Sequence, residues 1–174
     1  MAPSSLKLRA RLVAIAQLDV GEIETSRNHG PAIAKFWPAT SYEDGYRDRQ
    51  PYCAAAGCFW VKKWLLDPEV LSALNKTPSE AEAWRCKSAL VFDWIPWAKK
   101  NNLLVLDDSP KNVLHLGDIM IFDMSHFGIV TDDYKNRVRT IEANTGASGG
   151  RDGDGIFEKD RPREIAKCFI RILP

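Results

Sequence analysis

The sequence predicts a single α+β domain, with helices in the first part of the chain and an antiparallel sheet in the second. Apolar residues recur at helical spacing up to about residue 102, and short apolar runs separated by Gly, Asn and Asp turns follow. The 174 residues, 45% of them hydrophobic, are enough for one complete core and few for two. We therefore expect one domain over residues 1–174, with N-terminal helices packed on a C-terminal antiparallel sheet of about five to six strands.

The composition argues against two classes of partner. The chain has 24 basic and 23 acidic residues and a net charge of +1, so it lacks an overall field that would attract nucleic acid. No apolar run reaches the ~20 residues of a membrane helix, and the run Leu12–Leu18, interrupted by Gln17, does not resemble a secretory signal. We expect a protein made in the cytoplasm without a signal peptide, acting on an outside substrate only after release or export.

Helical spacing and helix-start signals place most of the helices. Two are expected before the cysteine-bearing segment, over residues 5–18 and 31–37. Thr77-Pro78-Ser79-Glu80 is a capping-box pattern with proline at the first helical position, so a helix should begin there and run through Trp84. The segment 94–102 should be a kinked or broken helix, because Pro96 removes a backbone donor.

Short strands are expected in the second half of the chain, separated by turn residues. They span residues 104–106, 118–123, 127–131, 138–143, 155–158 and 166–172. The glycine-rich stretch 149–155 has the composition of a loop. Helices followed by a meander of strands are typical of an α+β domain.

The stretch from Pro51 to Leu66 places a thiol, that of Cys53, on the first turn of an apolar helix. Proline suits a helix start, and the helix should end before Asp67-Pro68. The free N–H groups and the positive dipole end of a helix favour a thiolate there, which is what a nucleophile requires. The small residues Ala54–Gly57 would let another backbone approach just behind the sulfur. A lone cysteine on an apolar helix is more often a small core residue, so another segment has to supply a base.

The spacing of the four cysteines predicts neither a metal site nor a disulfide. Cys53, Cys58, Cys86 and Cys168 form no C-x-x-C pair, and only three histidines accompany them, so a structural metal is not expected. Free, mostly buried thiols are favoured over a Cys58–Cys86 or Cys86–Cys168 disulfide.

The loop before the cysteine carries three carboxylates, those of Glu43, Asp44 and Asp48. Carboxylates at this spacing could hold Ca²⁺, which takes six to eight oxygen ligands. Arg47 and Arg49 would compete as counter-ions. We therefore expect a solvated turn with internal ion pairs ahead of a calcium site, and no other cofactor.

A candidate base and its orienting partner lie on neighbouring strands. His126 begins the second strand of a predicted hairpin, and strand alternation puts Glu142 and Asn144 on one face of a later strand. If these strands are adjacent, one acceptor can hold the imidazole N–H while the other ring nitrogen faces Cys53. Each residue also has a structural explanation, as a hydrogen-bonded strand histidine, a strand-end carboxylate and a turn. We expect His115, at the approach to a strand, to be structural.

Four motifs together resemble the CHAP domains, cysteine- and histidine-dependent amidohydrolases and peptidases of phage endolysins and bacterial cell-wall hydrolases. They are Pro-Tyr-Cys-Ala-Ala at 51–55, Leu-Gly-Asp-Ile-Met-Ile-Phe at 116–122, Ser-His-Phe-Gly-Ile-Val at 125–130 and Ile-Glu-Ala-Asn-Thr at 141–145. The likeness extends over most of the chain. It implies a papain-like fold for a single CHAP-like catalytic domain.

The resemblance also implies a mechanism and a substrate class. Cys53 is then the nucleophile, His126 the general base and acid, and one of the two strand-end acceptors the orienting group. The backbone N–H of Cys53 forms part of the oxyanion hole, with Gln50 or Tyr52 as a second donor. The scissile bond is an amide of bacterial peptidoglycan, and its stem peptides are the binding partner. Some CHAP domains hold Ca²⁺ with acidic residues on both sides of the cysteine; here alanines follow Cys53, which leaves that site incomplete.

Three functions follow from these motifs. The first is an amidase or endopeptidase of the endolysin or cell-wall-hydrolase type. The second is a toxin-type amidase delivered into competitors and neutralised by an immunity protein, since the chain shows neither signal peptide nor wall-binding domain. The third is a wall-peptide binding module that has lost its chemistry. The bond that is cleaved, the oligomeric state and the choice between Glu142 and Asn144 are left open.

Overall fold

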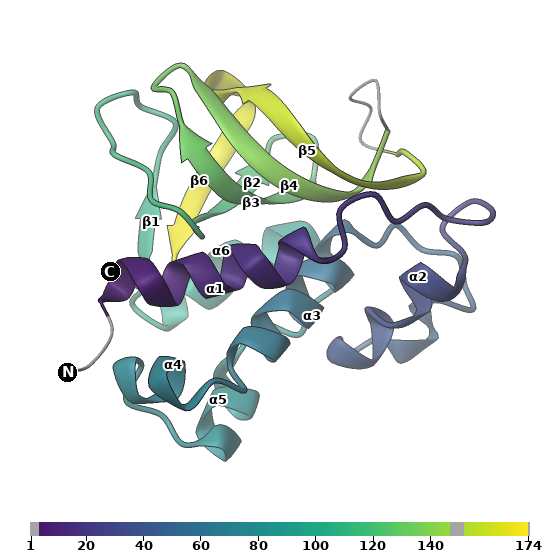
Figure 1. Ribbon diagram of the computed structural model, residues 1–174, viewed down its shortest axis with the longest axis horizontal. Coiled ribbons are helices and arrows are strands. Elements are labelled where there is room, and N and C mark those ends of the chain that lie inside the picture. Colours follow the sequence, from purple (N-terminus) through teal and green to yellow (C-terminus); the bar gives the residue numbers. More distant parts are fainter. Residues whose placement is uncertain (1–3, 147–151, 174) are drawn as a thin grey trace.

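The computed structural model of the protein describes residues 4–146 and 152–173. It confirms an α+β fold in which helices come first and an antiparallel sheet follows (Figure 1). The helices are α1 (Ser5–Gln17), α2 (Pro31–Ala34), α3 (Cys53–Trp64), α4 (Pro68–Ala73), α5 (Pro78–Trp84) and α6 (Trp94–Lys100), with 3₁₀ turns at Trp37–Ala39, Glu43–Gly45, Val91–Asp93 and Arg163–Ile165. The strands are β1 (Leu104–Leu106), β2 (Ile119–Phe122), β3 (His126–Asp133), β4 (Arg137–Thr145), β5 (Gly155–Pro162) and β6 (Ala166–Arg171).

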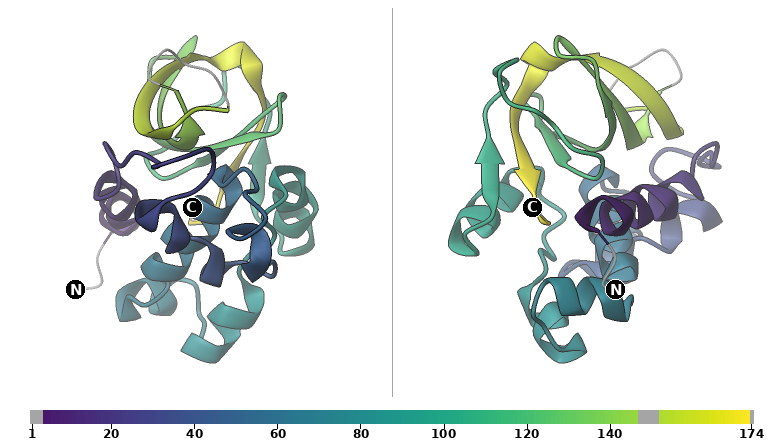
Figure 2. Two further views of the ribbon diagram at one scale, coloured as in Figure 1. Left: turned by 90° about the vertical axis from the view of Figure 1, so that its right-hand side faces the viewer. Right: turned by 60° about the vertical axis from the view of Figure 1, so that its left-hand side comes forward.

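The sheet has the strand order β1-β6-β2-β3-β4-β5, and all its neighbours are antiparallel. It curls strongly, and the helices lie against its outer face (Figure 2). The main core fills the space between the helices and this face. A smaller apolar cluster lies on the inner face of the curl, formed by Leu114, Met120, Phe122, Val130, Val138, Ala166 and Phe169. Among the described residues no helix is long and apolar enough to cross a membrane.

Helix α3 is tied to the N-terminal helix by two buried indoles. Trp64 Nε1 donates to the carbonyl oxygen of Leu8 in α1 at 2.8 Å, and Trp60 Nε1 donates at 2.8 Å to the carboxylate of Asp19, just beyond α1. A buried indole N–H without an acceptor would be costly, so these bonds fix the rotation of α3 as well as its position.

Helix α3 also lies unusually close to strand β3, because residue 57 is glycine. A β-carbon there would lie 2.5 Å from ring atoms of Phe127. Cys53 precedes Gly57 by about one helical turn, and His126 precedes Phe127 by one residue, so the contact brings the first turn of α3 to the start of β3. The close approach expected behind the sulfur is thus made by a ring of the sheet, not by another backbone.

Several element boundaries differ from the expectations; the helix expected over residues 31–37 ends at Ala34, and strand β3 continues to Asp133. Helix α6 is continuous, because Pro96 lies in its first turn, where a backbone N–H has no intrahelical acceptor. Helix α3 ends before Asp67-Pro68, as expected, but Pro68 also begins a further helix, α4, with Asp67 as its N-cap. Strand β5 continues to Pro162, four residues beyond its expected end. The capping box at Thr77 and Glu80 is confirmed. Of the stretch expected to be a loop, residues 149–151 lie outside the described residues.

Candidate active site

The thiol of Cys53 lies at the N-terminus of α3, beside a pocket of about 240 Å³. The side chain is 5% exposed. Tyr52, the N-cap residue, makes no side-chain cap, so no side chain occupies the N–H groups of the first turn from that position. The pocket is lined by Trp37, Tyr42, Gln50, Pro51, Cys53, Ala89, Leu90, Val91 and Ser125, none of which is charged.

The two expected oxyanion donors lie in different places. Gln50 lines the pocket beside Cys53, and its amide donates to the carbonyl of Asp48 at 3.2 Å. Tyr52 is buried in the main core, where its ring stacks on Phe36 with 6.1 Å between centroids. Its side chain is therefore not placed to donate into the pocket, and Gln50 is the candidate of the two.

His126 is the first residue of β3, directly after a three-residue hairpin turn. Ser125, the last turn residue, has a φ of 60°, the left-handed conformation that often closes such turns. The His126 ring is 2% exposed, and its Nε2 lies 3.0 Å from Glu142 Oε2. Cys53 lies close enough to the imidazole to be among the groups that raise its pKa. Since Nε2 is held by Glu142, Nδ1 is the ring nitrogen left to face the sulfur.

Glu142 lies on β4, opposite Gly128 of β3. A β-carbon at residue 128 would lie 3.2 Å from Glu142 Cγ, so the glycine makes room for the carboxylate. The side chain is fully buried and accepts from four groups. Thr140 Oγ1 and Arg161 Nε donate to Oε1 at 2.6 and 2.8 Å, and Arg161 Nη2 and His126 Nε2 donate to Oε2. The carboxylate is thus held on both oxygens.

Neighbouring charges outweigh burial at both ends of this pair. Burial alone would lower the pKa of His126, but hydrogen bonds to Cys53 and Glu142 raise it to about 9. Burial alone would raise the pKa of Glu142, but hydrogen bonds from Arg161 and His126 hold it well below its usual range. The geometry therefore favours an imidazolium and a carboxylate at neutral pH.

Asn144, the alternative orienting residue, is placed differently from Glu142. The register of β4 and β5 shifts between Ala143 and Thr145, and Asn144 within this bulge has a φ of 58°. Its backbone oxygen accepts from Gly153 N at 3.3 Å, whereas its buried side-chain oxygen has no hydrogen-bond partner in the described chain. The register shift at Asn144 interrupts the simple alternation from which both residues were expected to lie on one face. Of the two, Glu142 contacts the imidazole.

No protein-family model matches the chain, and no curated protein matches its sequence. The resemblance to CHAP domains therefore rests on the four motifs quoted above.

Sequence reasoning missed Arg161, which holds Glu142 together with Thr140. Its guanidinium makes the two-pronged contact with Glu142, and Nη2 also donates to Thr145 Oγ1 at 3.1 Å. The sequence offered one signal, a cation among the polar residues that follow Phe157. Because the strand was expected to end at Glu158, this cation fell outside the predicted sheet.

The remaining cysteines are free thiols in the structure. Burial raises the pKa of Cys58 well above its usual range and raises that of Cys86 and Cys168 to about 11. Their environments therefore favour neutral thiols. His115 likewise lies apart from the pocket, and burial, with help from Arg171, lowers its pKa.

The acidic loop expected to be a turn with ion pairs has those pairs. Arg47 bonds Asp44 at 3.1 Å and Asp48 at 3.0 Å, and the Tyr42 hydroxyl donates to Asp48. Glu43 lies in the adjoining 3₁₀ turn. Within residues 4–146 and 152–173, no group of three or more His, Cys, Asp or Glu side chains is placed to hold a metal ion.

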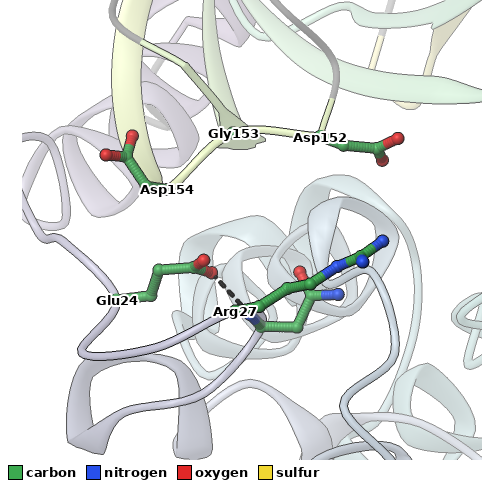
Figure 3. Close-up of a pocket in the computed structure, with 6 residues that line it drawn as sticks. Glu24, Arg27, Asp152, Gly153 and Asp154 are labelled. Carbon is green, nitrogen blue, oxygen red and sulfur yellow. Dashed lines mark hydrogen bonds between the residues drawn. The ribbon is translucent and has the colours of Figure 1, made fainter.

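A second hollow, of about 320 Å³, lies where the loop after α1 meets the start of β5 (Figure 3). Glu24, Asp152 and Asp154 contribute carboxylates to it, and Arg27 a cation. Asp152 points away from Glu24, whose carboxylate accepts the backbone N–H of Asn28 at 2.8 Å. Burial raises the pKa of Glu24, and the charge of Asp154 adds to the effect.

The raised pKa of His126 predicts a stability that falls at alkaline pH. A raised pKa means that the folded state binds a proton more tightly than the unfolded state, so the stabilisation is complete below about pH 6.5 and is lost as the pH rises to about 9. Urea unfolding between pH 6 and 10 should show the difference between the wild type and His126→Gln shrinking over this range. His115→Gln is the control, because a lowered pKa gives a pH dependence of opposite sign. A constant difference for His126→Gln would contradict the prediction.

Proposed function

We propose that the protein is a cysteine-dependent hydrolase of amide bonds in bacterial peptidoglycan, an amidase or endopeptidase of the CHAP type. The observation that carries the proposal is the convergence of Cys53, His126 and Glu142 from α3, β3 and β4: the imidazole is hydrogen-bonded to Glu142, and Cys53 lies near enough to raise its pKa. A thiol, a base and a group that orients the base are the parts that acyl transfer requires.

Each part has a defined role in the proposed reaction. In the reactive form the proton of Cys53 Sγ already resides on His126, and the thiolate attacks the amide carbonyl carbon, whose π electrons move to the oxygen. N–H groups of the first turn of α3 stabilise that oxyanion, with the Gln50 amide as a candidate second donor. As the C–N bond breaks, His126 gives its proton to the leaving amine and a thioester remains. Water, deprotonated by His126, then attacks the thioester; the C–S bond breaks, the carboxylic acid leaves, and the sulfur returns as a thiolate beside the imidazolium.

The pocket beside the sulfur supports an uncharged acyl group as the part of the substrate next to the scissile bond. Trp37, Leu90 and Val91 provide apolar walls, while Tyr42 and Gln50 add polar groups without charge. Lactyl and alanyl groups of peptidoglycan have this character. The assignment to peptidoglycan itself depends on the resemblance to CHAP domains.

Digestion of purified cell-wall sacculi tests the proposal. Wild-type protein should release soluble fragments, and mass spectrometry should find one new amine and one new carboxylate for each bond cut. The position of the cut identifies the bond, either between muramoyl and alanine or within or between stem peptides. Protein pre-alkylated at Cys53 is the control. Equal release by the active and the alkylated protein, or no release from sacculi of several chemotypes, would reject the proposal.

A binding module for wall peptides is the second candidate. The observation that favours it is the rim of exposed apolar side chains near the pocket, in which Tyr42 is 44% and Leu90 68% exposed. If the hydrolase is instead a toxin delivered into competitors, an immunity protein would cover this rim. The toxin would use the same Cys53 chemistry as the cell-wall hydrolase.

Selective alkylation separates the hydrolase from a binding module. At pH 6, limiting iodoacetamide should label Cys53 well ahead of Cys58, Cys86 and Cys168, because only Cys53 pairs with an imidazole and the raised pKa values of the others keep them neutral. Peptide mapping by mass spectrometry reads the order of labelling. Equal labelling of the four thiols would favour the binding module.

A further inference from the structure

We propose that Arg161 is a positioning residue of the active site, which keeps Glu142 ionised and fixed against His126. The inference rests on the proposed roles of Cys53, His126 and Glu142 and adds a fourth member from a different strand, β5. It assigns to the end of β5 a function that no motif indicated. Arg161 itself would not touch the substrate.

The geometry is that of a guanidinium fork on a carboxylate. Nε and Nη2 of Arg161 donate to the two oxygens of Glu142, and Thr140 Oγ1 donates to one of them from the neighbouring position on the same face of β4. Two parallel bonds fix the plane of the carboxylate as well as its position. The remaining lone pair of Oε2 is thereby aimed at His126 Nε2.

The guanidinium is held by a second set of contacts. Nη2 donates to Thr145 Oγ1, and the guanidinium carbon lies 5.8 Å from the centre of the Phe122 ring. The same ring lies 5.2 Å from the His126 ring, centre to centre. The Phe122 ring thus lies beside both the guanidinium and the imidazole, which meet at Glu142 Oε2.

Electrostatics explains why such a residue is needed. The Glu142 side chain is 0% exposed, and a buried carboxylate without a cation would take up a proton. A protonated Glu142 could no longer hold an imidazolium. With Arg161 in place, the charges of thiolate, imidazolium, carboxylate and guanidinium alternate along the series and sum to zero. Such an arrangement is the one a low-dielectric interior tolerates best.

The test compares Arg161→Gln and Arg161→Lys with Arg137→Gln. Arg137 also joins β4 to β5, through an ion pair with Asp160 at 2.9 Å, but that pair is about half exposed and lies away from the imidazole. The first readout is the pH profile of Cys53 alkylation by iodoacetamide, which needs no substrate. The second is kcat for release of wall fragments. The charged groups around the imidazole and its carboxylate are Cys53 on α3, Glu142 on β4, and Lys159 with Arg161 on β5.

Loss of the cation should favour the protonated form of each neighbouring group. We expect Arg161→Gln to move the midpoint of the alkylation profile upward by about one pH unit and to lower kcat about 10²-fold. Arg161→Lys keeps the charge without the fork, so it should leave the midpoint in place and lower both the alkylation rate and kcat about tenfold. Arg137→Gln should behave as wild type in both assays.

An alkylation midpoint of Arg161→Gln equal to that of the wild type would overturn the inference. Should this variant fail to fold, as judged by circular dichroism, Arg161→Lys decides: a wild-type alkylation rate overturns the inference, and a reduced rate with an unmoved midpoint supports it. The proposed function fails separately, when wild-type protein releases no wall fragments. The alkylation profile still decides the role of Arg161 in that case.

Discussion

Replacing Cys53 with alanine should abolish the release of wall fragments, lowering the rate by at least several orders of magnitude. Without the sulfur no thioester can form, and the oxyanion donors alone accelerate hydrolysis only weakly. The substitution removes one atom from a site that is 5% exposed, so we expect a loss of stability of about 1 kcal/mol at most. The measurement is the initial rate of fragment release from sacculi, followed by mass spectrometry.

Cys168→Ala is the matched control for this substitution. Cys168 is 6% exposed, similar to Cys53, but lies on β6 away from the pocket. It should retain wild-type activity. Equal activity of Cys53→Ala and wild type would show that the thiol is not the nucleophile, and any release would then need another explanation.

Replacing Glu142 with glutamine should have the second largest effect, on activity and stability together. Glutamine is close to isosteric but cannot balance an imidazolium, so we expect kcat to fall about 10⁴-fold, in line with the loss of the carboxylate from other triads. It also leaves Arg161, whose side chain is 12% exposed, without its counter-charge, which should cost about 3 kcal/mol of folding stability. Fragment release and urea unfolding at pH 7 measure the two effects.

Asn144→Gly distinguishes the carboxylate from the neighbouring amide. Glycine accepts the φ of 58° at this position, so the variant removes the side chain without straining the backbone. The Asn144 side-chain oxygen makes no hydrogen bond in the described chain, and we expect kcat to change less than threefold. A larger loss for Asn144→Gly than for Glu142→Gln would reverse the assignment of the orienting residue.

Much of the fold was predictable because its signals are local. Helical spacing of apolar residues and the Thr77–Glu80 capping box report on single elements, and these appear where expected. The thiol on the first turn of α3 and the histidine at the start of β3 were found for the same reason. The kink predicted at Pro96 is wrong, because the effect of a proline depends on where its helix begins.

The candidate site was predictable only in part, because its partners meet across strands. Alternation along β4 treated Glu142 and Asn144 alike, since no local signal marks the bulge that separates them. Arg161 was missed altogether because the length of β5 is set by pairing with β4, and the residues at its end are polar. Glu142 and Arg161 become neighbours only through the pairing of β4 with β5 and the burial of the carboxylate.

The sequence by itself determined the fold class, the helix that carries the thiol and the strand that carries the imidazole. These follow from the period of apolar side chains and from turn residues, which act within a few positions of one another. Only the tertiary structure decided which acceptor meets His126 and that a guanidinium lies behind it. Those contacts depend on strand register, on a bulge and on the curl of the sheet, which arise from packing between segments far apart in the chain.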